Sequence, residues 1–233
     1  MSESNLIKDN VNHETYASLL TLWDADEATR EKNFLGVTNP TLFGDDFTHD
    51  LCDGLDPEEK PSKDEARYKE KRICKCLYFY TKNPDNCTNH PECDYIQRGK
   101  RRRISRRSEY TIVDYEVPPY KDDRIEHVGE VDLILQGPDG IYATEIKPPK
   151  GNPETLRRMI AEIITYTLGG FTYKGETPHR AIAFFGDSRQ ARAYKRDKNK
   201  SELKALLKEA DITVFCFQEI EEEGEKVYTI CKL

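Results

Sequence analysis

The chain has 233 residues, and its 36 Lys and Arg against 43 Asp and Glu give a formal net charge of −7. This length suits one domain of ordinary to large size, or one domain with an insertion. No apolar run approaches the roughly 20 residues that a membrane span needs, and the first residues lack the basic start and apolar stretch of a secretory signal. The seven cysteines are an odd number for a disulfide framework, so we expect a reducing, cytoplasmic location and no membrane partner.

The charge is unevenly distributed along the chain. Residues 1–66 hold 5 basic and 16 acidic side chains, residues 67–107 hold 13 and 4, and residues 108–233 hold 18 and 23. A strongly basic block inside an acidic protein indicates a dedicated anionic partner rather than general affinity for polyanions.

Residues 1–107 are expected to form an N-terminal region of helices and loops. An amphipathic helix is predicted over residues 14–23, and residues 36–62 have the Gly, Pro and Asp content of a loop. Residues 64–72 are predicted to be helical. The β-branched and aromatic run ICKCLYFYT at 73–81 indicates a strand.

Residues 108–233 predict the main domain, a mixed α/β sheet with the element order β-β-β-α-β-α-β-β. Short apolar runs are separated by Pro-Pro, Gly-Gly and Gly-Pro-Asp-Gly sequences, which end strands and helices. Asn152 is expected to cap the first helix, with Pro153 at its first position. The expected strands are 110–117, 130–136, 141–147, 180–185, 212–218 and 226–231, and the expected helices end near 168 and 210.

The runs on either side of the Gly-Pro-Asp-Gly turn predict an antiparallel hairpin that carries chemistry. A symmetric turn places Asp132 opposite Glu145 and Glu130 opposite Lys147, all on one face. Facing Cβ atoms lie about 4.5–5.5 Å apart, so two carboxylates in otherwise apolar strands repel each other and are costly to desolvate. Mg²⁺ (or Mn²⁺) neutralises such a pair and keeps its other positions for water and phosphate. We therefore expect Asp132 and Glu145 to bind this metal beside Lys147.

Glu-Val-Asp132, the short hairpin, Glu145-Ile-Lys147 and the following helix resemble the core of the PD-(D/E)xK nuclease superfamily, which has the restriction-endonuclease-like fold. The resemblance covers about residues 110–186. It implies a central mixed β-sheet flanked by helices, with Asp132 and Glu145 as metal ligands. It also implies that Lys147 positions the water that attacks a phosphodiester.

The same resemblance points to residues outside the hairpin. Some branches of the superfamily carry a Gln and a Tyr on the helix after the E-x-K motif. Here Tyr166 matches, but Glu162 stands where Gln is usual, which leaves the branch open. Many members also have an upstream acid, for which Glu116 is the first candidate, with Glu65 and Glu14 after it.

Two other interpretations of the hairpin stay open. Its charged side chains would form an ion-pair ladder on a solvated edge, or the chain would be a catalytically inactive relative. A covered, central strand pair is favoured because the face opposite the acids is apolar, and apolar residues also share the acidic face. These residues are Val131, Leu133, Leu135, Tyr142 and Ile146 on the first face, and Ile134 and Ala143 on the second.

Two basic segments are candidates for nucleic-acid binding. The first, QRGKRRRISRR at 97–107, directly precedes the first strand of the main domain, and the second, within 187–200, follows the strand at 180–185. Such clusters neutralise phosphates with little sequence specificity. The alternatives are a nuclear-import-like tract for the first and a solvated helix face for the second. The candidate residues are Arg98, Lys100, Arg101, Arg102, Arg103, Arg106, Arg107, Arg189, Arg192 and Lys195.

Five potential soft metal ligands lie within twenty residues in the first region. Three of them on a Pro- and Asn-rich loop, with one of two preceding cysteines, suit a tetrahedral Zn²⁺ that would staple residues 74–93. The alternative is that the cysteines are free, and the spacing leaves both open. The residues are Cys74, Cys76, Cys87, His90 and Cys93.

Together these features predict a Mg²⁺-dependent endonuclease that hydrolyses phosphodiester bonds in DNA, with RNA as a further possible substrate. A homodimer is expected by resemblance, since many relatives cut both strands as dimers. The competing hypotheses are a non-catalytic nucleic-acid-binding protein with a zinc-stapled basic arm, and an RNA-cleaving defence or toxin effector.

Overall fold

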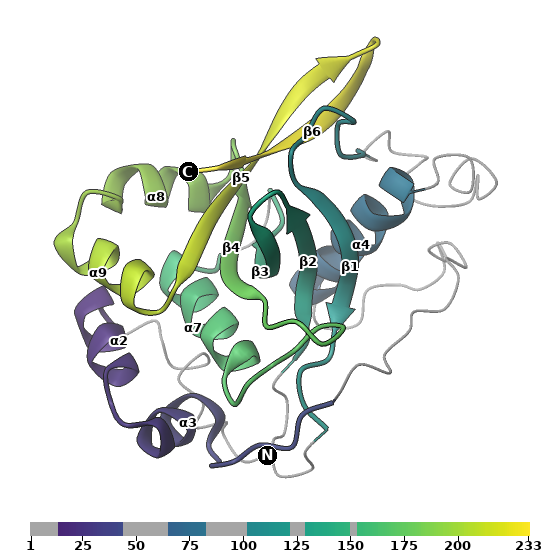
Figure 1. Cartoon of the computed structure of the whole chain (residues 1–233). Coiled ribbons are helices and arrows are strands. Elements are labelled where there is room, and N and C mark those ends of the chain that lie inside the picture. Colours follow the sequence, from purple (N-terminus) through teal and green to yellow (C-terminus); the bar gives the residue numbers. More distant parts are fainter. Residues whose placement is uncertain (1–13, 44–64, 83–101, 122–128, 150–152) are drawn as a thin grey trace.

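A six-stranded mixed sheet forms the centre of the molecule (Figure 1). The computed structural model describes residues 14–43, 65–82, 102–121, 129–149 and 153–233. The strands lie in sequence order; β1, β2 and β3 are antiparallel, β3, β4 and β5 are parallel, and β6 is antiparallel to β5. They are β1 (Thr111–Val117), β2 (Val131–Gly137), β3 (Gly140–Lys147), β4 (His179–Phe185), β5 (Ile212–Glu222) and β6 (Glu225–Lys232). The predicted mixed α/β sheet and its six strands are confirmed.

Helices cover both faces of the sheet, as expected for a sheet whose central strands are apolar on both sides (Figure 1). On one face, α7 contributes Met159, Ile160 and Ile163 to a core that also includes residues of α2, α3 and α9, and partly buried residues of α8 pack against it. On the other face α4 packs on β1 and β2. The helices are α2 (Tyr16–Trp23), α3 (Glu27–Leu35), α4 (Glu65–Lys82), α7 (Leu156–Thr167), α8 (Arg189–Asp197) and α9 (Ser201–Glu209).

The predicted strand at 73–81 is wrong, because this segment is the second half of α4. Its β-branched and aromatic residues favour a strand locally. However, its buried residues Ile73, Cys74, Leu77 and Tyr80 follow helical spacing, and together they pack against the outer face of the sheet. Burial of that stripe outweighs the β propensity of the segment.

Helix α7 begins later than predicted, at Leu156, and its N-cap is Thr155 rather than Asn152. The Thr155 hydroxyl accepts a hydrogen bond from the Arg158 amide at 3.3 Å. Two helices that the predicted element order does not include, α3 and α8, are short and mainly polar. Their capping residues are Asp26 and Ser188, each of which accepts a hydrogen bond from an amide of the first turn.

The N-terminal helices are joined to the main sheet by tertiary contacts. The Trp23 indole donates to the Glu209 carbonyl at 3.0 Å, and the Tyr16 hydroxyl donates to Asp197 at 3.2 Å. The division of the chain at residue 107 stays a prediction. Among the described helices, none combines the length and apolar character required to cross a membrane.

Candidate active site

The β2–β3 hairpin has the register that the sequence predicts. Leu133 pairs with Thr144, and the ladder continues to Gly137 and Gly140 at the turn. The same register places Asp132 opposite Glu145 at the end of the ladder. The Asp132 carboxylate also accepts a hydrogen bond from the Ile146 amide at 2.8 Å.

A third acid occupies the neighbouring position on β1. Val117 pairs with Val131 and Tyr115 with Leu133, so Glu116 lies opposite Asp132. Glu116 is half-buried and has a φ of 47°, a left-handed backbone conformation that is energetically costly for a residue other than glycine. The register thus aligns Glu116, Asp132 and Glu145 across three adjacent strands.

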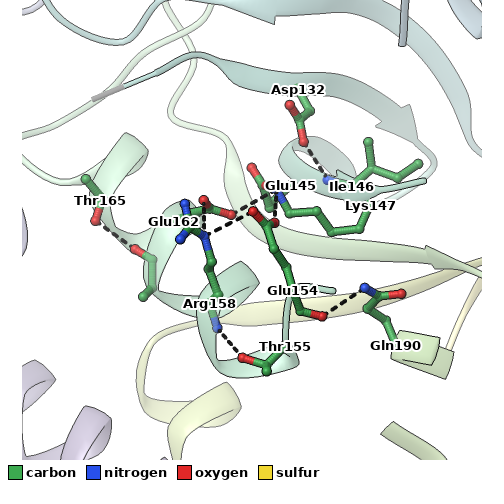
Figure 2. A network of polar contacts seen from close by, with 11 residues as sticks. Asp132, Glu145, Ile146, Lys147, Glu154, Thr155, Arg158, Glu162, Thr165 and Gln190 are labelled. Atoms are coloured by element: carbon green, nitrogen blue, oxygen red, sulfur yellow. Dashed lines mark hydrogen bonds and ion pairs between the residues drawn. The ribbon is translucent and has the colours of Figure 1, made fainter. Parts of the chain in front are cut away.

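Lys147 lies inside a cage of carboxylates (Figure 2). Its ammonium group contacts Glu145, and lies 2.8 Å from Glu154 and 3.0 Å from Glu162. Glu145, Lys147 and Glu162 are 1%, 2% and 4% exposed, respectively. Three acids around one ammonium ion in the protein interior are the central feature of this site.

Helix α7 supplies one side of the cage through residues at intervals of four. Glu162 and Tyr166 lie on successive turns, and Arg158, one turn earlier, reaches both Glu162 at 3.0 Å and Glu154 at 3.2 Å (Figure 2). Tyr166 packs against Gly129, since a Cβ at Gly129 would lie 2.8 Å from the Tyr166 hydroxyl. Gly129 also has a φ of 95°, so both space and conformation require glycine at the entry to β2.

The cluster carries more negative than positive charge. The acids are Asp132, Glu145, Glu154 and Glu162, and the cations are Lys147 and Arg158, which leaves a formal charge of −2. Glu145 is close enough to Asp132 and Glu162 to affect the pKa of both carboxyl groups. Carboxyl groups that share a site in this way favour a proton or a cation between them.

The pKa values show how the site distributes protons. Burial raises the pKa of Asp132 to about 7, against the opposing effects of Lys147 and the Ile146 amide. Burial acts in the same direction on Glu162, but Lys147 and Arg158 outweigh it and hold its pKa below the ordinary value. Burial, followed by Glu162 and Glu145, raises the pKa of Tyr166 well above its usual range. Without a metal, Asp132 is therefore the acid of this group that keeps its proton to the highest pH, and a bound cation would have to displace that proton.

The residues of the hairpin fit a Mg²⁺ ion, which takes only one or two carboxylates and completes its shell with water and phosphate. Asp132 and Glu145 are adjacent, and the surrounding charge is negative. Among the described residues, no three His, Cys, Asp or Glu side chains form a ready-made metal site. A two-carboxylate site does not require such a group.

The expected zinc ligands are only partly within the described residues. Cys74 and Cys76 both lie on α4, not on a strand as predicted. Cys74 is fully buried in the core between α4 and the sheet, and Cys76 is half-buried. Cys87, His90 and Cys93 lie outside the described residues. The zinc loop stays a prediction.

Two residues of the first basic segment form ion pairs with acids of the β5–β6 hairpin. Arg103, only 7% exposed, lies 2.8 Å from Glu222, and Arg102 lies 3.3 Å from Glu219. This differs from the expected role of Arg103, because its guanidinium is enclosed by protein rather than presented to phosphate. Arg106 and Arg107 are exposed, whereas Arg98, Lys100 and Arg101 lie outside the described residues.

The second basic segment is a helix, α8, and its first turn touches the candidate site. Arg189 donates to the Pro153 carbonyl at 3.2 Å. Gln190 donates to the Glu154 carbonyl at 2.9 Å (Figure 2). Arg189, Arg192 and Lys195 are all exposed. The structure thus brings the first turn of this basic helix beside Glu154, and the nucleic-acid-binding role of its exposed residues stays a prediction.

Glu154 and Arg158 are the members of the cluster that sequence reasoning missed. The i, i+4, i+8 spacing of Glu154, Arg158 and Glu162 was available as a signal. The spacing does not single out Glu154, because an acid beside a helix N-terminus has an ordinary explanation in helix electrostatics.

No protein-family model matches the chain, and no curated protein matches it. Among solved structures, the chain is similar to SfsA of Pyrococcus furiosus in complex with Ca²⁺, with 17% sequence identity and a TM-score of 0.28. The match covers 72% of this chain and 63% of that one, so the chain spans less than two thirds of the length of SfsA. At this TM-score we draw nothing from the similarity about this chain.

Proposed function

We propose that the protein is a divalent-metal-dependent nuclease that hydrolyses phosphodiester bonds in DNA. The observation that carries the proposal is the group formed by half-buried Asp132 and by buried Glu145 and Lys147, enclosed by further acids and left with a formal charge of −2. A structural ion-pair ladder on a solvated edge does not explain it, because these side chains lie between the sheet and α7.

Each residue has a distinct part in the proposed reaction. Asp132 and Glu145 would hold Mg²⁺ or Mn²⁺, which when bound polarises the scissile phosphate and lowers the pKa of a coordinated water. Lys147 would donate hydrogen bonds to the attacking water or to the phosphate oxygens. Its cage of acids restrains the ammonium group and keeps it near Glu145.

The exposed side chains of α8 would bring the polyanion to this acidic site. Arg189, Arg192 and Lys195 are positioned by the helix whose first turn binds the backbone of Pro153 and Glu154. Such phosphate contacts supply affinity that falls steeply with salt concentration. Arg106 and Arg107 would add to the same surface or bind a more distant part of the strand.

A cleavage assay tests the proposal. Supercoiled plasmid, single-stranded DNA and single-stranded RNA are incubated with the purified chain in Mg²⁺, Mn²⁺ or EDTA. We expect metal-dependent cleavage of DNA, reduced at least about 100-fold by Asp132→Asn and by Lys147→Met. Asp139→Asn, which removes an exposed acid from the turn of the same hairpin, is the matched control and should cleave normally. Cleavage in EDTA, or normal rates in both site variants, would overturn the proposal. Cleavage of RNA alone would exclude DNA as the substrate.

A further inference from the structure

Glu154 is an additional acid at the site, and it comes from the connection between β3 and α7 rather than from either element. Its carboxylate lies 2.8 Å from the Lys147 ammonium and 3.2 Å from the Arg158 guanidinium (Figure 2). Its side chain is 23% exposed, against 3% for the side chain of Lys147, so Glu154 is the more solvent-accessible partner in this ion pair.

The position of Glu154 is fixed from α8. Gln190, which is 1% exposed, donates a hydrogen bond from its side-chain amide to the Glu154 carbonyl at 2.9 Å. Arg189 binds the preceding carbonyl at 3.2 Å. Because Gln190 is buried and Arg189 is exposed, the first turn of α8 joins a basic surface to the residue that holds Lys147.

The three carboxylates around Lys147 are not equivalent in the proposed reaction. Glu145 would be engaged by the metal, so its attraction for the ammonium would weaken. Glu162 is shared with Arg158 at 3.0 Å. Glu154 and Glu162 together would then keep the ammonium in place while Glu145 acts as a ligand.

We propose that Glu154 is a positioning residue for Lys147, and that Gln190 connects it to the basic helix α8. This inference rests on the proposed nuclease function. It predicts that the lysine is held ready for reaction from the side of the molecule that binds the nucleic acid backbone.

Steady-state kinetics of Glu154→Gln test the positioning role. We expect kcat for DNA cleavage to fall by about 10- to 100-fold, because a small displacement of a reacting group has effects of this size. KM and the half-saturating Mg²⁺ concentration should stay within about twofold, because Glu154 is expected to bind neither DNA nor metal. Gln190→Leu should lower kcat less, and combining it with Glu154→Gln should add little. Glu202→Gln, an exposed acid in the first turn of α9, is the matched control.

A second measurement does not depend on activity. Urea unfolding in EDTA is compared for the wild type, Glu154→Gln, Lys147→Met and the double variant. We expect Glu154→Gln to shift the unfolding midpoint in the wild-type background, and to shift it clearly less when Lys147 is already Met. If Glu154→Gln shifts the unfolding midpoint equally in the two backgrounds, the contact between Glu154 and Lys147 does not contribute to stability and the inference is wrong.

The two experiments separate the possible failures. Wild-type kcat in Glu154→Gln would overturn the positioning role and leave the nuclease function intact. If the wild type cleaves no polynucleotide with any divalent ion, the proposed function fails, together with the role of Glu154 in it. The unfolding comparison would still decide whether Glu154 and Lys147 are coupled.

Discussion

Asp132→Asn is expected to stabilise the metal-free protein. Burial raises the pKa of Asp132 from 3.8 to about 7, so its charged form is disfavoured in the folded state. The variant removes the ionisable group but keeps an oxygen that can accept the hydrogen bond from the Ile146 amide. It therefore isolates the electrostatic cost of an acid that the proposed reaction requires.

The size and sign of the effect follow from proton linkage. The folded protein holds the Asp132 proton more tightly than the unfolded chain does. The contribution of the protonated Asp132 side chain to the free energy of unfolding is thus fully present below about pH 4, and it is lost as the pH rises to about 7. At about 1.4 kcal/mol per pKa unit, the full loss at pH 8 is at most about 4 kcal/mol. For a chain of this length, 1 kcal/mol corresponds to about 2–4 °C in Tm.

Thermal unfolding in EDTA at pH 5 and pH 8 measures this effect. Asp132→Asn should have the higher Tm at both values, with the larger advantage at pH 8. Asp139→Asn is the control with the opposite sign, because the Lys232 ion pair lowers the pKa of Asp139 to about 2. Its carboxylate stabilises the fold above about pH 4, so its loss should lower Tm at both values. An Asp132→Asn protein no more stable than the wild type at pH 8, or with an advantage independent of pH, would refute the reasoning.

Gly129→Ala should lower the free energy of unfolding by about 1–3 kcal/mol and displace Tyr166, because it combines a positive φ with a close contact. Gly170→Ala, with a φ of 88° and open space around the position, should lower the free energy of unfolding less when both variants are unfolded with urea. Equal losses in the two variants would exclude the close contact with Tyr166. Arg103→Ala should lower Tm by several degrees, since it leaves Glu222 enclosed without its closest cation. Arg107→Ala should leave Tm unchanged but weaken DNA binding at low salt, measured by fluorescence anisotropy, and unchanged affinity would remove Arg107 from the binding surface.

The sheet and its β2–β3 hairpin were predictable because local signals agreed. Alternating apolar residues and a Gly-Pro-Asp-Gly turn define the register that places Asp132 opposite Glu145. Helix α4 was not predictable in the same way, because the β propensity of 73–81 conflicts with its helical spacing. Packing against β1 and β2 decides between them.

Other features of the fold and of the site depend on contacts between distant segments. Arg103 and Glu222 are separated by 119 residues, so the sequence shows a basic tract and an acidic hairpin but not their pairing. Gln190 likewise reaches the Glu154 carbonyl across 36 residues. Charge patterns in the sequence indicate which side chains need a partner of opposite charge, whereas the fold determines which residues form the ion pairs and hydrogen bonds.

Anomalous X-ray diffraction from crystals soaked in Mn²⁺ tests the central claim most directly. We expect a manganese peak next to the carboxylates of both Asp132 and Glu145 in the wild type, and its loss in Asp132→Asn. A wild-type site without manganese, at a concentration that supports DNA cleavage, would contradict it.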